Sequence, residues 1–209
     1  AALKNNHLDR RVVLQMWDPR HDLGEDGKDF PCNLTITFSF NPLNEALDMT
    51  VFNRSNDIVW GAYGANAVHM SMLQEYVARS LGWDVGCYWQ VSTNWHAYVN
   101  TFDKIGGLHI YANDEENPYE AIKTFPLMKP RGREQWDQDL RIFLEEGPIV
   151  GFRDPFFRRV ATPIYHSWMA KQDKANPDRW EHAMEIIGQC AAEAWRIACQ
   201  QWLMRHKPQ

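Results

Sequence analysis

The stretch that most constrains the fold is residues 34–52, where apolar and polar side chains alternate along two segments. Apolar residues occupy every second position: Leu34, Ile36, Phe38 and Phe40 in the first segment, and Leu47, Met49 and Val51 in the second. A period of two indicates a strand with one buried face. The residues between the segments, Asn41-Pro42-Leu43-Asn44-Glu45, tend to break strands. The stretch therefore predicts an antiparallel hairpin with its turn at residues 41–45.

The open end of this hairpin is predicted to bring a cysteine and an arginine close together. Cys32 precedes the first strand and Arg54 follows the second, so antiparallel pairing brings the two together near Asn53. A guanidinium beside a thiol favours the thiolate form. A lone cysteine is more often a buried small hydrophobic residue. Three features nevertheless make Cys32 the candidate nucleophile: the preceding Pro31, the loop before the strand, and Arg54.

Weaker periodic patterns surround the hairpin. In chain order they predict a short buried strand over residues 12–17, a charged loop over 20–29, a helix over 66–81 ended by Gly82, and a strand over 87–98. On local grounds we expect Asn66 to be the N-cap of the helix. His96 and Tyr98 share one face of the last strand, so both could bind a sugar hydroxyl. The alternative is a satisfied pair within the core.

The second half of the chain differs in composition and in its predicted secondary structure. Proline and charge dominate residues 112–135, which predict a loop or arm. A short helix is expected over 136–144 and another helix over 156–169, which Pro163 either interrupts or begins. The last helix is the best marked, with Asn176 as N-cap and Pro177 in its first turn. Its apolar stripe runs to Leu203 and includes three tryptophans: Trp180, Trp195 and Trp202. This stripe could dock a partner, but packing against the chain's own sheet is the favoured expectation.

Composition narrows the classes of function. The chain has 209 residues and a net charge of -5, so no general nucleic-acid surface is indicated. Four cysteines without a CxxC pair suit a reducing compartment. No run approaches the roughly 18 apolar residues that a membrane span requires. We expect a soluble, cytoplasmic protein with no metal site and neither a nucleic-acid nor a membrane partner.

Two arginine-bearing segments are candidates for binding a phosphate. Arg54 offers a fork of donors, and Ser55 adds a hydroxyl. Arg10 and Arg11 precede an apolar strand, where one of the two should point inward unless a ligand or a partner chain meets it. Together with Cys32, these residues suggest a phosphorylated, hydroxyl-bearing small molecule placed over the cysteine.

Five motifs, in order over residues 9–102, resemble thymidylate synthase and its hydroxymethylase relatives of bacteriophages. They are Asp9-Arg10-Arg11-Val-Val-Leu-Gln-Met-Trp-Asp-Pro, Pro31-Cys32, Arg54-Ser55-Asn56-Asp57, a glycine-bearing turn to Asn66, and His96-Ala-Tyr98-Val-Asn100. The resemblance implies an α+β, thymidylate synthase-like fold whose mainly antiparallel or mixed sheet is packed with helices. We then expect a catalytic core over residues 1–102, a loop or arm over 103–135, and a helical C-terminal segment over 136–209 packed on that core.

The resemblance also implies a reaction. Cys32 would add to C6 of a deoxypyrimidine monophosphate, and C5 would attack the one-carbon unit of 5,10-methylenetetrahydrofolate. The remaining roles it implies are the 5′-phosphate for Arg54 and Ser55, the pyrimidine edge for Asn66, the sugar hydroxyl for His96 and Tyr98, and the folate side for Asp57. Arg10 and Arg11 would reach the phosphate of a neighbouring subunit, which implies a homodimer.

Departures from the synthase pattern favour hydroxymethyl transfer over methyl transfer. Asn33 stands where synthases carry histidine, and Asn56 matches the hydroxymethylase branch. One extra residue separates Gly61 from Asn66, so the base-reading role of Asn66 is less secure than the phosphate role of Arg54. The family's apolar closing tail, which excludes water during hydride transfer, is not recognisable. An asparagine where cytosine-specific relatives use aspartate favours dUMP over dCMP.

Several alternatives stay open on the sequence. The family's first hundred or so residues are not recognisable before Arg10. We therefore expect a fragment, although residues 103–209 could replace the missing part. The chain could also be a true thymidylate synthase. The rival of another class is a non-catalytic nucleotide-binding relative, and a further possibility makes the C-terminal half an interaction module. A phage-encoded enzyme would act in the host cytoplasm.

Overall fold

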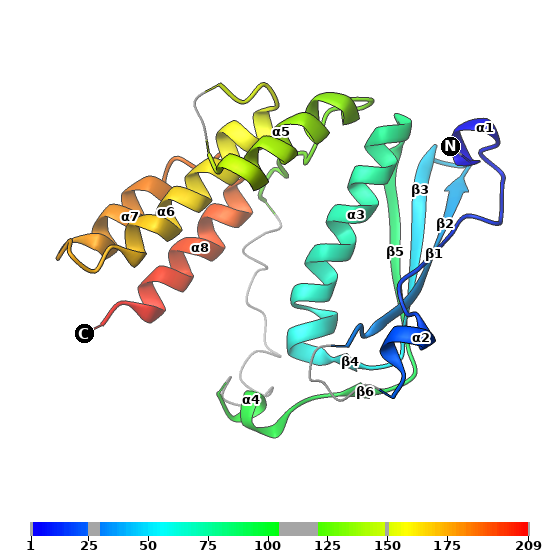
Figure 1. The fold of residues 1–209 in the computed structure, drawn as a ribbon, viewed down its shortest axis with the longest axis horizontal. Coiled ribbons are helices and arrows are strands. Elements are labelled where there is room, and N and C mark those ends of the chain that lie inside the picture. The colour runs from blue at the N-terminus through cyan, green and yellow to red at the C-terminus, as the bar shows by residue number, and fades with distance from the viewer. Residues whose placement is uncertain (1, 25–29, 105–120, 149–150, 209) are drawn as a thin grey trace. The chain divides into compact units, whose positions relative to one another are not determined.

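The computed structural model describes residues 2–24, 30–104, 121–148 and 151–208 (Figure 1). The chain forms two compact units, Ala1–Glu115 and Glu116–Gln209. The elements of the first unit are α1 (Ala2–Asn5), β1 (Val13–Gln15), α2 (Pro19–Asp22), β2 (Asn33–Asn41), β3 (Ala46–Asn53), β4 (Asn56–Asp57), a π-helical turn (Ile58–Ala62), α3 (Ala65–Leu81), β5 (Asp84–Ser92), β6 (Trp95–His96) and α4 (Val99–Lys104).

The predicted hairpin is confirmed as the centre of a mixed sheet. The strand order is β1-β2-β3-β5, with β2 antiparallel to both β1 and β3. Ile36 pairs with Val51, and Phe38 pairs with Met49, so the apolar positions of the two strands share one face. The last strand, β5, runs parallel to β3 after a crossover through α3. Helices with a mixed sheet make the unit α+β.

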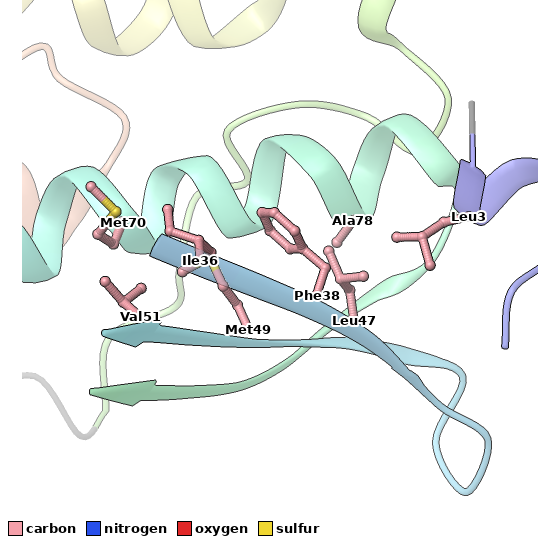
Figure 2. Close-up of a cluster of buried hydrophobic side chains, with 8 residues drawn as sticks. All are labelled: Leu3, Ile36, Phe38, Leu47, Met49, Val51, Met70 and Ala78. Atoms are coloured by element: carbon pink, nitrogen blue, oxygen red, sulfur yellow. The ribbon is translucent and has the colours of Figure 1, made fainter. Parts of the chain in front are cut away.

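The core of the first unit lies between α3 and the sheet. Figure 2 shows its eight buried side chains: Leu3, Ile36, Phe38, Leu47, Met49, Val51, Met70 and Ala78. Burying a side chain such as Leu47 contributes about 1.5–3 kcal/mol. Gln74 is the polar exception on α3. Its amide is buried and donates to the carbonyl oxygens of Leu47 at 2.8 Å and Cys87 at 3.0 Å, which ties α3 to both β3 and β5.

Two expectations for this unit differ from the structure. The strand predicted as buried over residues 12–17 is shorter, and all three residues of β1 are exposed. The reason is its edge position, where β1 pairs with β2 alone and only the flanking Val12 and Met16 pack on the core. The first residues of the loop predicted over 20–29 belong instead to α2, and residues 25–29 lie outside the described chain.

The helix predicted to end at Gly82 is confirmed, because Gly82 adopts φ 82° as the C-cap of α3.

The second unit is helical. Its elements are α5 (Arg133–Glu146), a π-helical turn (Phe157–Ala161), α6 (Thr162–Gln172), α7 (Arg179–Ile187) and α8 (Glu193–His206). The helix predicted over 136–144 is confirmed and is longer at both ends. The helix predicted over 156–169 is confirmed as a π-helical turn followed by α6, with Pro163 in the first turn of α6. The predicted packing of this segment on the catalytic core stays a prediction. No helix in the described part of the chain is long and apolar enough to cross a membrane.

The single last helix predicted from Asn176 to Leu203 is wrong. The structure has two helices, α7 and α8, because the chain turns between them at residues 188–192. In that turn Cys190 is buried, and the Ala191 amide donates to the carbonyl oxygen of Arg159 at 2.9 Å. Asn176 does not cap a helix. Its side chain accepts from the Asp178 amide at 2.9 Å, one residue before α7 begins.

Candidate active site

The end of the hairpin brings Cys32 and Arg54 together, as predicted. Asn33 pairs with Asn53, so the residues on either side of this pair are adjacent. The Arg54 amide donates to the Cys32 carbonyl oxygen at 3.0 Å, and its Nε donates to the Pro31 carbonyl oxygen at 3.0 Å. Cys32 is a free, half-buried cysteine. The thiol is thus carried on a backbone segment that Arg54 holds in place.

The guanidinium of Arg54 keeps binding capacity after these contacts. Nη2 donates to the Phe30 carbonyl oxygen at 3.4 Å, and the group lies over the Trp17 ring at 5.3 Å from its centroid. A guanidinium has five N–H groups, and among the described residues only two of these five meet an acceptor. The other three can bind an anion. Ser55 follows directly and is half-buried, so its hydroxyl belongs to the same neighbourhood.

Buried amides form a network beside this segment. Asn56 is fully buried, and its Nδ2 donates to Gln90 Oε1 at 2.9 Å and to Ser92 Oγ at 3.1 Å. Its Oδ1 accepts a long bond of 3.5 Å from Asn66 Nδ2. Gln90 in turn donates to the Ala62 carbonyl oxygen at 2.9 Å. The network is neutral throughout and links β4, β5 and the start of α3.

Sequence reasoning missed Gln90 and Ser92. Both are half-buried members of β5, where inward positions alternate with the exposed Trp89 and Val91. The alternation of side chains along β5 could have predicted their role, because it places the polar residues Gln90 and Ser92 on the inward face. What the sequence does not reveal is that parallel pairing with β3 aligns Ser92 with Asn53.

Asn66 is not the N-cap of α3. Gly64 occupies that position, and Asn66 is the second residue of the helix. Gly61 explains how Asn66 reaches Asn56. A Cβ at Gly61 would lie 2.2 Å from Asn56 Oδ1 and 3.1 Å from Asn66 Nδ2, so only glycine leaves room for both amides.

Asp57, His96 and Tyr98 lie around the small β4–β6 pair. Asp57 pairs with His96 in the strand register, and its Oδ1 accepts from the Trp60 amide at 2.6 Å. Its Oδ2 is buried and meets no donor among the described residues. His96 and Tyr98 do not share a strand face, because β6 ends at His96. Their rings instead meet edge to face, with centroids 5.3 Å apart.

Arg10 and Arg11 lie away from Cys32 within the same chain. The Phe38 amide donates to the Val12 carbonyl oxygen at 3.2 Å, which places the arginines toward the hairpin turn. Cys32 precedes Phe38 by a span of about 20 Å at the rise of a strand. Neither arginine points inward, as both are exposed. Arg11 forms a two-pronged pair with Asp9 at 3.0 Å, and its hydrogen bonds lower the pKa of Asp9 to about 2.

The described ranges contain no group of three His, Cys, Asp or Glu side chains that could hold a metal ion. The candidate site offers one thiol, one guanidinium, a buried carboxylate and neutral amides. Such a set can hold a phosphate at Arg54, offer donors and acceptors to a planar heterocycle, and present a sulfur nucleophile.

Comparison with known proteins agrees with this chemistry. The family model for thymidylate synthase matches residues 1–131. A deoxyuridylate hydroxymethyltransferase of Pseudomonas phage M6 is 48% identical over 99% of this chain and 61% of its own length. One of Bacillus phage SP01 is 39% identical over 82% of this chain and 46% of its own length. A thymidylate synthase of Streptococcus pyogenes serotype M5 (strain Manfredo) is 34% identical over 49% of this chain and 37% of its own length. The chain thus spans between about a third and three fifths of these relatives.

Proposed function

The chain belongs to the thymidylate synthase family, and we propose that it transfers a hydroxymethyl unit to C5 of deoxyuridine monophosphate (dUMP). The observation that carries this proposal is the Arg54–Cys32 contact, which supplies a phosphate-binding guanidinium and a nucleophile on one rigid corner. Two phage relatives named deoxyuridylate hydroxymethyltransferase, 48% and 39% identical, support the choice of product.

Cys32 starts the proposed reaction. Its thiolate forms a bond to C6 of the pyrimidine, and the electron pair of the C5–C6 double bond moves to C5. 5,10-Methylenetetrahydrofolate supplies the one-carbon unit that C5 attacks. Loss of the C5 proton then expels tetrahydrofolate and leaves an exocyclic methylene group on C5. Water adds to that methylene carbon, and departure of Cys32 restores the C5–C6 double bond. Arg54 serves this sequence by fixing the phosphate and the backbone that carries the thiol.

The remaining residues orient the two substrates in this proposal. Asn66 binds the pyrimidine edge, because its amide can both donate and accept hydrogen bonds. Its hydrogen-bond partner Asn56 is also a neutral amide, and this uncharged pair suits uracil. His96 and Tyr98 bind the sugar hydroxyl. Asp57 faces the folate, and its buried Oδ2, which accepts no hydrogen bond from the described residues, fits a ring N–H donor.

Two features of the first unit support a homodimer in this proposal. Val13, Trp89 and Val91 are exposed and pair with Thr37, Thr50 and Phe52, which alternate with core residues, so all three lie on the sheet face opposite α3. Such a patch favours association. The second observation is the span of about 20 Å between the Arg10–Arg11 segment and Cys32 along β2. Arg10 and Arg11 therefore serve the phosphate site of the second subunit rather than their own.

Product analysis tests the proposal. The protein is incubated with methylenetetrahydrofolate and either dUMP or dCMP. The mass of the nucleotide product is measured by mass spectrometry, and dihydrofolate is followed by absorbance. We expect hydroxymethyl-dUMP and no dihydrofolate. Methyl-dUMP with dihydrofolate would make the chain a synthase. Bound nucleotide without any product would favour the non-catalytic relative.

A further inference from the structure

A pocket in the second unit has a composition that the proposed reaction does not use. It has a volume of about 330 Å³ and is formed by α6, α7, α8 and the segment between α6 and α7. Its lining combines four basic side chains with two aromatic rings: Lys171, Lys174, Arg179, His206, Trp180 and Trp202. We call it the cationic–aromatic pocket.

Lys171 occupies the centre of the aromatic rings. Its ammonium lies 4.5 Å from the Trp168 ring centroid, 5.1 Å from that of Trp202 and 5.6 Å from that of Trp180. The rings stabilise the ammonium but leave its net positive charge in place. An aromatic cage already filled by a cation of the same chain does not suit a cationic ligand. It raises the positive potential of the pocket instead.

The basic groups of the pocket also lack acidic partners. Lys171, Lys174 and Arg179 form no ion pair with any described carboxylate, whereas Lys207, just outside, is bonded to Glu181. Asp173 and Asp178, the two acids of the segment between α6 and α7, form no ion pair with them in the described structure. Asp173 instead accepts the Ala175 amide at 3.1 Å. Unpaired cations lining one pocket favour an anionic ligand.

The position of Arg179 at the start of α7 also favours an anionic ligand. Arg179 is the first residue of α7, where the helix dipole favours negative charge and disfavours a guanidinium. Its position therefore does not stabilise the helix. A bound phosphate beside Arg179 would be attracted by both the guanidinium and the helix N-terminus.

The aromatic groups supply flat surfaces beside these cations. Trp202 and His206 are stacked at 4.3 Å between ring centroids with an angle of 21° between the rings. The His206 ring is held there by a contact of 2.8 Å between its Nδ1 and the Trp202 carbonyl oxygen. Bases stack on such rings without regard to base identity.

We propose that the cationic–aromatic pocket binds a nucleoside phosphate, with the phosphate on Lys174 and Arg179 and the base on the exposed His206 ring, where it extends the Trp202–His206 stack. A single nucleotide is favoured over a nucleic-acid strand for two reasons. The volume is that of a small-ligand site. Residues 116–209 also carry 14 basic against 13 acidic side chains, so the unit has no excess positive charge to follow a backbone.

The test separates this pocket from the proposed active site. All proteins carry Arg54→Ala, which weakens nucleotide binding in the first unit. The probes are 5-iododeoxyuridine monophosphate, the same nucleoside without phosphate, and an end-blocked oligothymidylate. Binding is measured by equilibrium dialysis, and the iodinated nucleotide is photocrosslinked so that mass spectrometry identifies the modified peptide. Turnover plays no part in the readout.

The variant is Lys174→Gln with Arg179→Gln, and the control is Lys123→Gln with Arg141→Gln, which removes the same charge from exposed positions that do not line the pocket. We expect crosslinks within residues 168–206, no binding of the nucleoside, and an affinity loss of about tenfold or more in the variant alone. Crosslinks confined to the first unit, or equal affinity of variant and control, would overturn the proposal. Tighter, strongly salt-dependent binding of the oligonucleotide would overturn the assignment to a single nucleotide.

Discussion

Arg54 holds the backbone of Cys32 from the neighbouring strand end. Its amide donates to the carbonyl oxygen of Cys32, its Nε to that of Pro31 and its Nη2 to that of Phe30, at 3.0, 3.0 and 3.4 Å. Three successive carbonyl groups are thus fixed by one residue. In the proposed reaction Arg54 both binds the phosphate and positions the nucleophile relative to it.

Substitution of Arg54 should therefore affect binding more than charge alone predicts. Arg54→Ala is expected to weaken dUMP binding by about 1.5–3 kcal/mol, since it removes charge-assisted hydrogen bonds. Arg54→Lys keeps the charge but loses the fork of donors, so it should recover only part of that loss. Titration calorimetry measures both. Arg20→Ala, which breaks an exposed pair with Asp18, is the control and should bind as the parent does.

Cys32→Ser should abolish turnover and leave dUMP affinity within about twofold of the parent, because a serine hydroxyl is a far weaker nucleophile at neutral pH. Cys87→Ser is the matched control, as Cys87 is an exposed free cysteine of the same unit. Turnover and affinity are measured in parallel. Residual turnover in Cys32→Ser would remove this residue from the chemistry.

Gly61→Ala should destabilise the first unit by about 1–3 kcal/mol, since the added methyl group overlaps Asn56 Oδ1. Denaturant titration measures the loss. The double variant Gly61→Ala with Asn56→Ala removes the clash. Its destabilisation should then be smaller than the sum of the two single changes. Simple additivity would mean that Asn56 is not the group that excludes a side chain.

Asp154 gives a pH-dependent prediction for the second unit. Burial raises its pKa and the nearby Asp139 adds to that rise, while the hydrogen bond from the Phe156 amide and the charges of Lys129 and Arg158 oppose it. A raised pKa means that the folded protein favours the protonated acid, so this contribution to stability is present at acidic pH and is lost as pH rises through the folded pKa.

Asp154→Asn cannot ionise, and its amide oxygen can still accept the Phe156 amide. The variant should therefore gain in Tm relative to the parent at about pH 7 and lose that gain toward about pH 4. Calorimetric melting curves across this range check the sign. A gain that is larger in acid would contradict the burial argument. The exposed Asp173→Asn serves as the control.

Mixed dimers test the proposed role of the arginine pair. A Cys32→Ser subunit lacks a nucleophile, and a subunit with Arg10→Ala and Arg11→Ala lacks the arginines for its partner's phosphate site. In a mixed dimer one site has both groups intact. Statistical mixing of equal amounts makes about half of the dimers mixed, so we expect about a quarter of the parent's sites to be restored. No activity beyond the separate variants would place Arg10 and Arg11 outside the partner's site.

The hairpin and the Arg54–Cys32 contact could be predicted because both depend on local periodicity and one turn. Strands of period two with a strand-breaking turn leave little choice of register. The parallel position of β5 could not be predicted, since it depends on how α3 crosses the sheet. Its consequence, the alignment of Ser92 with Asn53 beside Asn56, was missed for the same reason.

The break between α7 and α8 escaped prediction for a different reason. Apolar residues continue at helical spacing through it, with Ile187, Cys190 and Ala191 in sequence. Periodicity therefore does not mark the turn. The chain turns there because Cys190 and Ala192 pack into the core of the second unit, a tertiary effect that local propensity does not contain.

The central claim is that Cys32 forms a bond to C6 of the nucleotide. The most direct measurement uses dUMP with fluorine in place of the C5 hydrogen, together with methylenetetrahydrofolate, followed by mass spectrometry of the digested protein. Fluorine cannot leave C5 as a proton does, so the covalent adduct should accumulate. We predict that the peptide containing Cys32 gains the mass of nucleotide and folate. An unmodified Cys32 peptide from protein that still binds the nucleotide would contradict the account.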